Sequence, residues 1–325
     1  MWYNNPNNDV FSLLWLSHIE RLFVCAKVNS KATGRNGIMY YGAIEAGGTK
    51  MVCAVGNADG SIVERMETPT LTPEETMPVM LAFFEKYEIE TLGIGTFGPV
   101  ELNKNSERYG SILTSPKMGW QDFNFYKYFK EHIGCKVVVD TDVNVAALGE
   151  QRKGVLQGIR NGMYLTIGTG VGGGIIAEGN LVHGMLHPET GHILLQRHPE
   201  DKMESFCRFH DNCLEGLAAG PAVEKRAGMK GNDLPEDHPV WDMESWYIAQ
   251  ALVSYTMVLA TERIVLGGGV MKQLHLFPKI RKEYAKLMNG YLDTKQLKDL
   301  DTFIVPAGLH GDQGIIGALF LGIEG

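Results

Sequence analysis

The sequence has no uninterrupted apolar run of about 18 residues, the length that a membrane-spanning helix requires. Positive charge is also scarce, because 30 Lys and Arg stand against 38 Asp and Glu, a formal net charge of -8. Nucleic acid binds to basic surfaces, so this balance argues against nucleic acid as a partner. The five cysteines do not resemble a disulfide framework, and no secretory signal precedes them. We therefore expect a cytoplasmic protein with reduced thiols and no membrane partner.

The length of 325 residues exceeds what one hydrophobic core usually supports, which predicts two domains. We place them at residues 39–150 and 151–310, with the last helix, 311–323, packing back on the first domain. Residues 1–38 differ from both, because an Asn-rich start is followed by a short apolar piece and a polar run. We expect this N-terminal extension to be disordered or partly helical, with Met39 as an alternative first residue.

Short strands separated by glycine turns open each domain, and helices follow them. Three strands from Tyr40 predict an antiparallel meander, and a similar set restarts after Gly154. The repeat indicates duplication, with a cleft between the two copies. The expected strands are 40–46, 51–56, 61–69, 91–99, 135–140, 162–169, 171–179, 180–184, 262–270 and 301–307, and the expected helices are 73–87, 121–134, 143–154, 217–227, 241–260, 277–292 and 311–323.

Four glycine turns follow predicted strands: EAGGTK (45–50), GTGVGGG (168–174), LGGGV (266–270) and GLHGDQG (308–314). Glycine lets a backbone come close enough to bind a phosphate through its amides. One such turn more often marks a hairpin, but four of them predict nucleotide binding. None of the four turns fits the spacing GxxxxGK[ST], so the sequence contains no P-loop of the common nucleotide-binding kind at these turns. The first two lie between hairpin strands, the arrangement of the actin and hexokinase architecture. The expected fold is therefore α/β, with duplicated actin/hexokinase-like (ribonuclease H-like) βββαβα domains and an ATP cleft between them.

Residues 189–215 concentrate thiols, imidazoles and carboxylates. Cys207, His210 and Cys213 are spaced three apart, and His192 can complete a tetrahedral site of the Cys2His2 kind, which favours structural zinc. Two alternatives stay open: a Cys207–Cys213 disulfide, and buried thiols beside a hydrogen-bonded histidine. Four protein ligands leave no open position on the ion, so zinc would brace this insertion and hold Glu189 and Glu215 in place.

Asp142 is the catalytic candidate. It follows the buried strand 135–140 at its carboxyl end, where binding sites of α/β sheets lie. Phosphoryl transfer to a sugar hydroxyl needs an aspartate to accept the hydroxyl proton, and magnesium to offset phosphate charge. An ordinary helix N-cap is the competing interpretation of Asp142. We prefer Asp142 to Asp140 because strand alternation and the following helical turn direct it toward the opening.

Several separated motifs resemble the ROK family (repressor, open reading frame, kinase) of sugar kinases, over about residues 40–323. The run LTIGTGVGGGIIAEGNLVHGMLHPETGH resembles its signature segment, and CRFHDNCLEGLAAGP resembles its zinc and sugar segment. EAGGTK, FGPVELN, YGSILTSPKMGW and DTDVNVAALGE are most similar to the fructokinase branch.

This resemblance implies a role for each matching residue. Asp142 would be the base and Asn144 its substrate-binding neighbour, while Glu189, His192 and Glu215 would contact sugar hydroxyls. His192 would also ligate zinc together with Cys207, His210 and Cys213. The ATP site would contain Gly47, Gly48, Thr49, Lys50, Thr169, Pro221, Gly267, Gly268, Gly269, Val270 and Met271. Two positions depart from the commoner family pattern: Glu45 replaces an aspartate, and His210 replaces a third cysteine.

The function implied is an ATP-dependent, magnesium-requiring hexose kinase that makes fructose 6-phosphate, with a homodimer as the expected assembly. A kinase for mannose, glucose or an N-acetylhexosamine is the nearest alternative. A sugar-responsive repressor is less favoured, because only 38 residues precede the kinase-like part and they show no clear helix-turn-helix. A silent sugar-binding module fits poorly with the intact Asp142 and the glycine turns.

Overall fold

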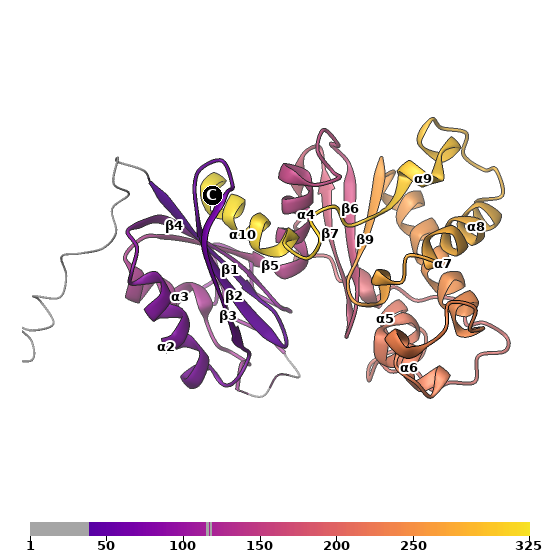
Figure 1. The fold of residues 1–325 in the computed structure, drawn as a ribbon, viewed down its shortest axis with the longest axis horizontal. Helices are drawn as coiled ribbons and strands as arrows, with labels where there is room; N and C mark the ends of the chain where they lie inside the picture. The colour runs from indigo at the N-terminus through magenta and orange to yellow at the C-terminus, as the bar shows by residue number, and fades with distance from the viewer. Residues whose placement is uncertain (1–38, 115–116, 118) are drawn as a thin grey trace, which may run out of the picture.

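The computed structural model describes residues 39–114, 117 and 119–325, so the predicted extension 1–38 lies outside the described residues. The chain forms two five-stranded mixed sheets with helices around and between them (Figure 1). The α/β actin/hexokinase-like class is confirmed by this arrangement. The first sheet has the order β3-β2-β1-β4-β5 and contains β1 (Tyr40–Ala46), β2 (Lys50–Gly56), β3 (Ile62–Pro69), β4 (Ile89–Thr96) and β5 (Lys136–Thr141).

The second sheet repeats the first. Its order is β10-β9-β6-β7-β8, and its strands are β6 (Gly162–Ile167), β7 (Val171–Ala177), β8 (Asn180–Leu181), β9 (Arg263–Gly267) and β10 (Ile304–Pro306). In each sheet the first three strands in sequence pair antiparallel, the fourth pairs with the first in parallel, and the fifth pairs with the fourth in parallel. This correspondence confirms the predicted duplication. The exact division into domains stays a prediction.

Two helices cover one face of the first sheet. Helix α2 (Pro73–Phe84) begins with a capping box between Thr72 and Glu75, and α3 (Phe125–Ile133) ends at Gly134, whose φ of 74° favours glycine. Beneath them lies an aromatic core in which the buried Trp120 ring stacks on Phe125 at 5.3 Å.

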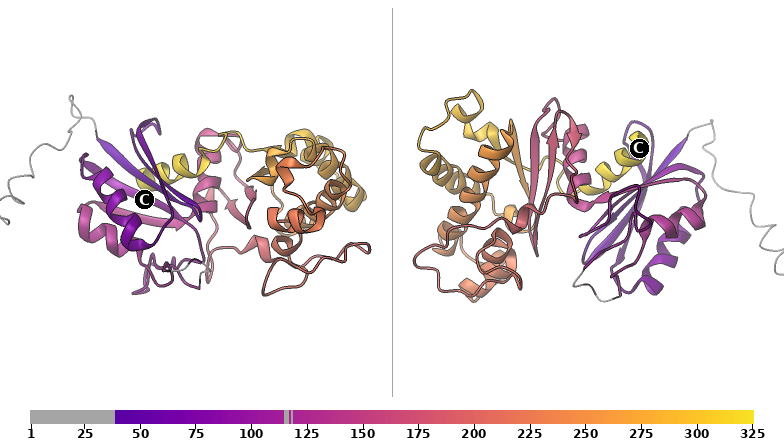
Figure 2. Two further views of the ribbon diagram at one scale, coloured as in Figure 1. Left: turned by 60° about the horizontal axis from the view of Figure 1, so that its bottom comes forward. Right: turned by 180° about the vertical axis from the view of Figure 1, so that it is seen from behind.

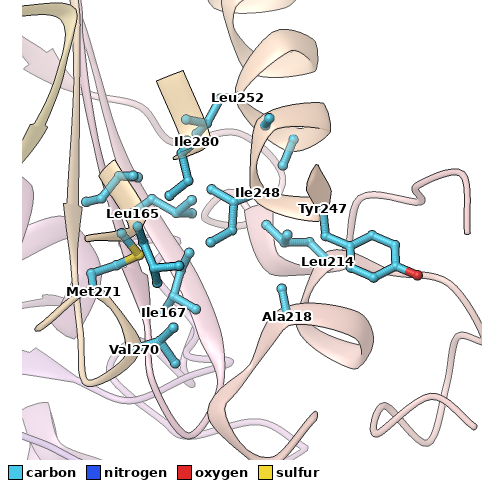
Figure 3. Close-up of a cluster of buried hydrophobic side chains, with 14 of the residues drawn as sticks. Leu165, Ile167, Leu214, Ala218, Tyr247, Ile248, Leu252, Val270, Met271 and Ile280 are labelled. Atoms are coloured by element: carbon cyan, nitrogen blue, oxygen red, sulfur yellow. The ribbon is translucent and has the colours of Figure 1, made fainter. Parts of the chain in front are cut away.

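Helices of the second half pack on the outer face of the second sheet (Figure 2). Their shared core joins Leu165 and Ile167 of β6 to Ile248 and Leu252 of the long helix and Ile280 of the next (Figure 3). The helices are α5 (Leu214–Ala218), α6 (Gly220–Ala227), α7 (Val240–Leu259), α8 (Leu276–Met288) and α9 (Leu300–Phe303), with short 3-10 turns η1 (Thr190–His192), η2 (Gly231–Asp233), η3 (Val270–Lys272) and η4 (Gln296–Lys298).

Helices α4 (Asp142–Lys153) and α10 (Gln313–Glu324) lie between the two sheets (Figure 1). Helix α4 leaves the first sheet and packs on β6 and β7, whereas α10 leaves the second sheet and packs on β1, β2 and β4, as predicted for the last helix. The two helices touch backbone to backbone. A Cβ on Gly317 would overlap the carbonyl of Val145, and one on Gly149 would overlap the carbonyl of Gln313. Only glycine permits this approach.

A buried carboxylate ties together the two chain crossings between the halves. Glu150 of α4 accepts hydrogen bonds from the backbone N–H of Val155, at 2.9 Å, and from those of Gly308 and Leu309, at 2.9 and 3.2 Å. Val155 lies on the way from α4 to β6, and the other two lie on the way from β10 to α10. These three bonds satisfy a side chain that is 0% exposed.

Four predicted elements were partly wrong. Strand 180–184 is reduced to the two residues of β8. The predicted helix 217–227 is two helices, because Pro221 lacks the N–H needed to continue and Ala219 is extended. The predicted strand 301–307 begins inside α9. Helix α3 also starts later than predicted, since Asn124 caps it by accepting from the N–H of Lys127 at 2.7 Å.

Within the described ranges, no helix is both long and apolar enough to cross a bilayer.

Gly317→Ala is expected to lower the midpoint of thermal unfolding by on the order of 5 °C, because the new methyl forces two helix backbones apart. Gly269→Ala is the matched control, since its Cβ would meet nothing within 4 Å and its φ of -63° suits alanine. Differential scanning calorimetry measures both. Equal midpoints for the two variants would contradict the packing argument.

Candidate functional site

Asp142 is the first residue of α4, directly after β5. The capping interpretation was wrong, because the N-cap is Thr141, whose side chain accepts from the N–H of Asn144 at 3.0 Å. Asp140 is buried and fully engaged: it accepts from its neighbour Thr141, from Asn144 Nδ2 at 2.7 Å and lies 2.8 Å from His183 Nε2. Asp142 is therefore the carboxylate of this pair that is available for chemistry.

Asn144 completes the start of α4. Its amide nitrogen donates to Asp140, whereas its buried carbonyl oxygen, Oδ1, has no hydrogen-bond partner in the part of the chain that the structure describes. Buried polar atoms are nearly always paired. The free acceptor is therefore suited to a hydroxyl group of a ligand.

Carboxylates from separate segments gather around Asp142. Burial and, next in size, the neighbouring Glu45 carboxylate at the end of β1 raise the pKa of Asp142 to about 7. Burial also raises the pKa of Glu45 to about 7, against the opposing effect of Arg65. Burial and then the Glu215 carboxylate raise the pKa of Glu189 to about 6. Such clustered, shifted acids are typical of functional sites and of places that a cation neutralises.

The structure brings the four predicted zinc ligands together. One donor atom each of His192, Cys207, His210 and Cys213 lies within 4.8 Å of all the others. Cys207 Sγ is 3.8 Å from His192 Nδ1 and 3.7 Å from His210 Nδ1. These separations match the edge of about 3.6 Å that tetrahedral Zn–S and Zn–N bonds give. The disulfide alternative was wrong, because both cysteines are free.

Backbone donors support the two sulfurs. Phe209 N–H donates to Cys207 Sγ at 3.4 Å, and Gly216 N–H donates to Cys213 Sγ at 3.3 Å. Burial raises the pKa of Cys213 to about 11, so a metal ion that binds here must displace the thiol proton. Bonds of this kind stabilise thiolates, and the donor set therefore fits zinc.

Glu215 connects this quartet with the second glycine turn. Its Oε1 is 3.9 Å from His192 Nε2, and its Oε2 accepts from the backbone N–H of Val171 at 3.0 Å. The predicted sugar contacts, Glu189, His192 and Glu215, thus lie next to each other beside Asp142.

A pocket of about 390 Å³ lies between the glycine turns of the second half. Four of the residues predicted for ATP line it: Thr169, Pro221, Gly269 and Val270. Met271 does not, because its side chain is 3% exposed and belongs to the core shown in Figure 3.

The other predicted ATP residues lie elsewhere. Gly268, with a φ of +89°, packs against the backbone of Ile167, and Gly267 packs against the Tyr164 ring. Gly47, Gly48, Thr49 and Lys50 form the β1–β2 turn of the other half and do not line this pocket.

Known proteins resemble this chain along most of its length. A sequence profile of the ROK family matches residues 41–324. The chain belongs to the ROK family. It is 47% identical over 283 residues to a fructokinase of Pediococcus pentosaceus, covering 87% of this chain and 97% of that protein. It is 40% identical over 286 residues to a fructokinase of Streptococcus mutans, covering 86% of this chain and 96% of that protein.

The fold of a ROK hexokinase from Thermus thermophilus matches as well. The TM-score is 0.72 at 24% identity, covering 87% of this chain and 98% of that protein. Membership of the ROK family agrees with the paired sheets and the glycine turns described above.

Sequence reasoning missed three residues of this ROK-family site. His183 binds Asp140, His187 lies beside Glu189, and Trp241 lines the pocket. The run NLVHGMLHPETGH contains both histidines, but we read it as strand followed by loop. Trp241 lies on the long apolar helix α7, where a buried aromatic side chain indicates core and not a ligand contact.

Asp142→Asn is expected to stabilise the fold more at pH 8 than at pH 5. A carboxyl whose pKa rises from 3.8 unfolded to about 7 folded binds its proton more tightly in the fold, so stability falls as pH rises between these values. Above pH 7 the loss is on the order of 4 kcal/mol, which Asn removes. Thermal unfolding at both pH values tests this, with the exposed Asp237→Asn as control. A pH-independent effect of Asp142→Asn would contradict it.

Proposed function

We propose that this protein transfers the terminal phosphoryl group of ATP to a hydroxyl of fructose, giving fructose 6-phosphate. The observation that carries the proposal is the Asp142 carboxylate, which accepts from the N–H of Val143 and lies near the carboxylates of Glu45 and Glu189. The names of the two fructokinase relatives, at 47% and 40% identity, support fructose over mannose, glucose or an N-acetylhexosamine.

Asp142 acts as the general base. Its pKa of about 7 is close to neutral pH, where a base both exists in its ionised form and accepts a proton readily. Glu189, Glu215 and the free oxygen of Asn144 accept hydrogen bonds from sugar hydroxyls, and His192 Nε2 provides a further polar contact. These contacts hold the acceptor hydroxyl in line for transfer.

ATP binds in the pocket between the glycine turns of the second half. Thr169, Pro221, Gly269 and Val270 line the pocket for it, and the turn from Gly47 to Lys50 approaches its phosphates from the first half. Magnesium, when bound with ATP, offsets the negative charge of the phosphates. Glu45 lies next to Asp142 and can hold the ion, and its longer side chain serves in place of the usual aspartate.

We further propose that His192, Cys207, His210 and Cys213 hold a structural zinc ion. With four ligands the ion has no open position, so its role is to fix the loop. Through His192 it fixes Glu215, which in turn holds the N–H of Val171 at the glycine turn. The predicted homodimer and cytoplasmic location stay predictions.

Asp142→Ala is expected to lower kcat for fructose roughly 10²–10⁴-fold, because the acceptor hydroxyl loses its base. A coupled assay for ADP measures this, and circular dichroism checks that the variant is folded. Asp237→Asn, an exposed substitution in the second half, is expected to keep wild-type turnover. Near-normal activity of a folded Asp142→Ala protein would refute the assignment.

Cys207→Ser is expected to reduce the zinc content from one ion per chain to well below one, and to lower the thermal midpoint because the loop loses its brace. Cys135→Ser, a thiol of the first half, is the matched control and retains zinc. Plasma emission spectroscopy of purified protein measures the metal. Wild-type protein that carries no zinc, or Cys207→Ser protein that carries a full ion, would rule the site out.

A further inference from the structure

His183 joins the two halves of the molecule two residues away from Asp142. It lies on the segment between β8 and η1 of the second half, and its Nε2 is 2.8 Å from Oδ2 of Asp140 in β5 of the first half. The Asp140 side chain is 5% exposed and that of His183 is 40% exposed. The same segment has a second contact with the first half, because Nε2 of His187 accepts from the backbone N–H of Val100 at 3.2 Å. The segment that carries His183 is therefore anchored at two points.

The two carboxylate oxygens of Asp140 have separate partners. Oδ1 accepts from the backbone N–H of Thr141 at 2.7 Å and from Nδ2 of Asn144 at 2.7 Å. Thr141 in turn caps α4, since its side chain accepts from the N–H of Asn144 at 3.0 Å. Oδ1 therefore closes the turn 140–144 on itself, whereas Oδ2 connects this turn to His183 of the other half.

The ring of His183 is suited to the doubly protonated form. Besides Asp140, the backbone carbonyl of Leu181 accepts a hydrogen bond from this ring, and a neutral imidazole has one N–H. The hydrogen bond to Asp140 is the main cause that raises the pKa of His183, while burial and Lys104 oppose it. The bond between the halves is therefore charge-assisted, which is the stronger kind of hydrogen bond.

The side chain of Asp142 takes its position from the turn 140–144. The hydrogen bonds to its carboxylate come from backbone N–H groups, that of Val143 at 2.9 Å and its own. Both groups belong to the turn, so a shift of the turn moves the carboxylate with it. Among the described residues, His183 is the partner of the buried Oδ2 of Asp140. A buried acceptor that loses its donor is costly, so the turn rearranges toward another donor when His183 is replaced.

We propose that His183 is a positioning residue, which acts through Asp140 to hold the turn 140–144 and with it the carboxylate of Asp142. The inference rests on the proposed function, since it assumes that Asp142 is the base. His183 belongs to the half that contains the glycine-lined pocket. The contact therefore sets the base of the reaction relative to the half that we propose to bind ATP.

Two substitutions of His183 separate the hydrogen bond from the bulk of the ring. His183→Gln keeps an amide N–H near the position of Nε2, whereas His183→Leu keeps an apolar side chain without a donor. Asp140→Asn, alone and combined with His183→Leu, tests whether His183 acts through Asp140. His132→Leu, which replaces an exposed histidine at the end of α3, is the control.

The measurements are kcat and KM for fructose, KM for ATP, and the midpoint of thermal unfolding. We expect His183→Leu to lower kcat about 10–100-fold, because a small displacement of a reacting group costs rate. Both KM values are expected to stay within about 3-fold of wild type, since the contacts that bind the substrates remain. His183→Gln is expected to retain kcat within about 5-fold of wild type, because the donor is kept. The double variant is expected to be no slower than the slower single variant, because both changes remove the same contact.

Three results would overturn the proposal. The first is a folded His183→Leu protein that keeps wild-type kcat and loses only thermal stability, which is what a purely structural role predicts. The second is that His183→Gln is as slow as His183→Leu. The third is that the losses of the two single variants multiply in the double variant, since independent residues behave in that way.

The assay uses fructose, mannose, glucose and N-acetylglucosamine, so kcat is read on whichever sugar the wild-type protein phosphorylates. Phosphorylation of a sugar other than fructose refutes the fructose assignment alone. Phosphorylation of none of the four sugars refutes both proposals.

Discussion

The close crossing of α4 and α10 is the constraint on which the molecule depends. Each helix starts from one sheet and packs on the other, so their contact joins two repeats that share no strand. Gly149 and Gly317 allow the backbones to touch. Since Asp142 is the first residue of α4, the same contact fixes the carboxylate that we propose as the base relative to both sheets.

The site gathers negative charge at a cost to stability. Asp142, Glu45 and Glu189 have raised pKa values because they are buried and near each other, so their ionised forms are disfavoured in the fold. Proteins commonly lose some stability at sites where function requires buried charge. The Cys and His quartet lies beside this region, and the Nε2 of its His192 is 3.9 Å from Glu215.

The parts that could be predicted from the sequence are those set by short-range patterns. Glycine turns after apolar runs predicted the strands and their duplication, and the spacing of Cys207, His210 and Cys213 predicted the cluster. Contacts between distant segments could not be predicted. Nothing local indicates that His187 meets Val100, because this contact is decided by packing between segments that are 87 residues apart. By contrast, the break between α5 and α6 could have been predicted from Pro221, because proline has no N–H for the hydrogen bonds that continue a helix.

The buried carboxylate of Glu150 limits how the two halves can move relative to each other. Both passages of the chain from one half to the other bind to this single buried carboxylate, so they cannot slide past each other without breaking its three hydrogen bonds. A motion of the two halves that kept these hydrogen bonds would be a swing about a pivot at the carboxyl end of α4. Asp142 lies about 12 Å from that pivot along the helix. In such a swing, parts of the two halves that lie farther from the pivot would travel along wider arcs.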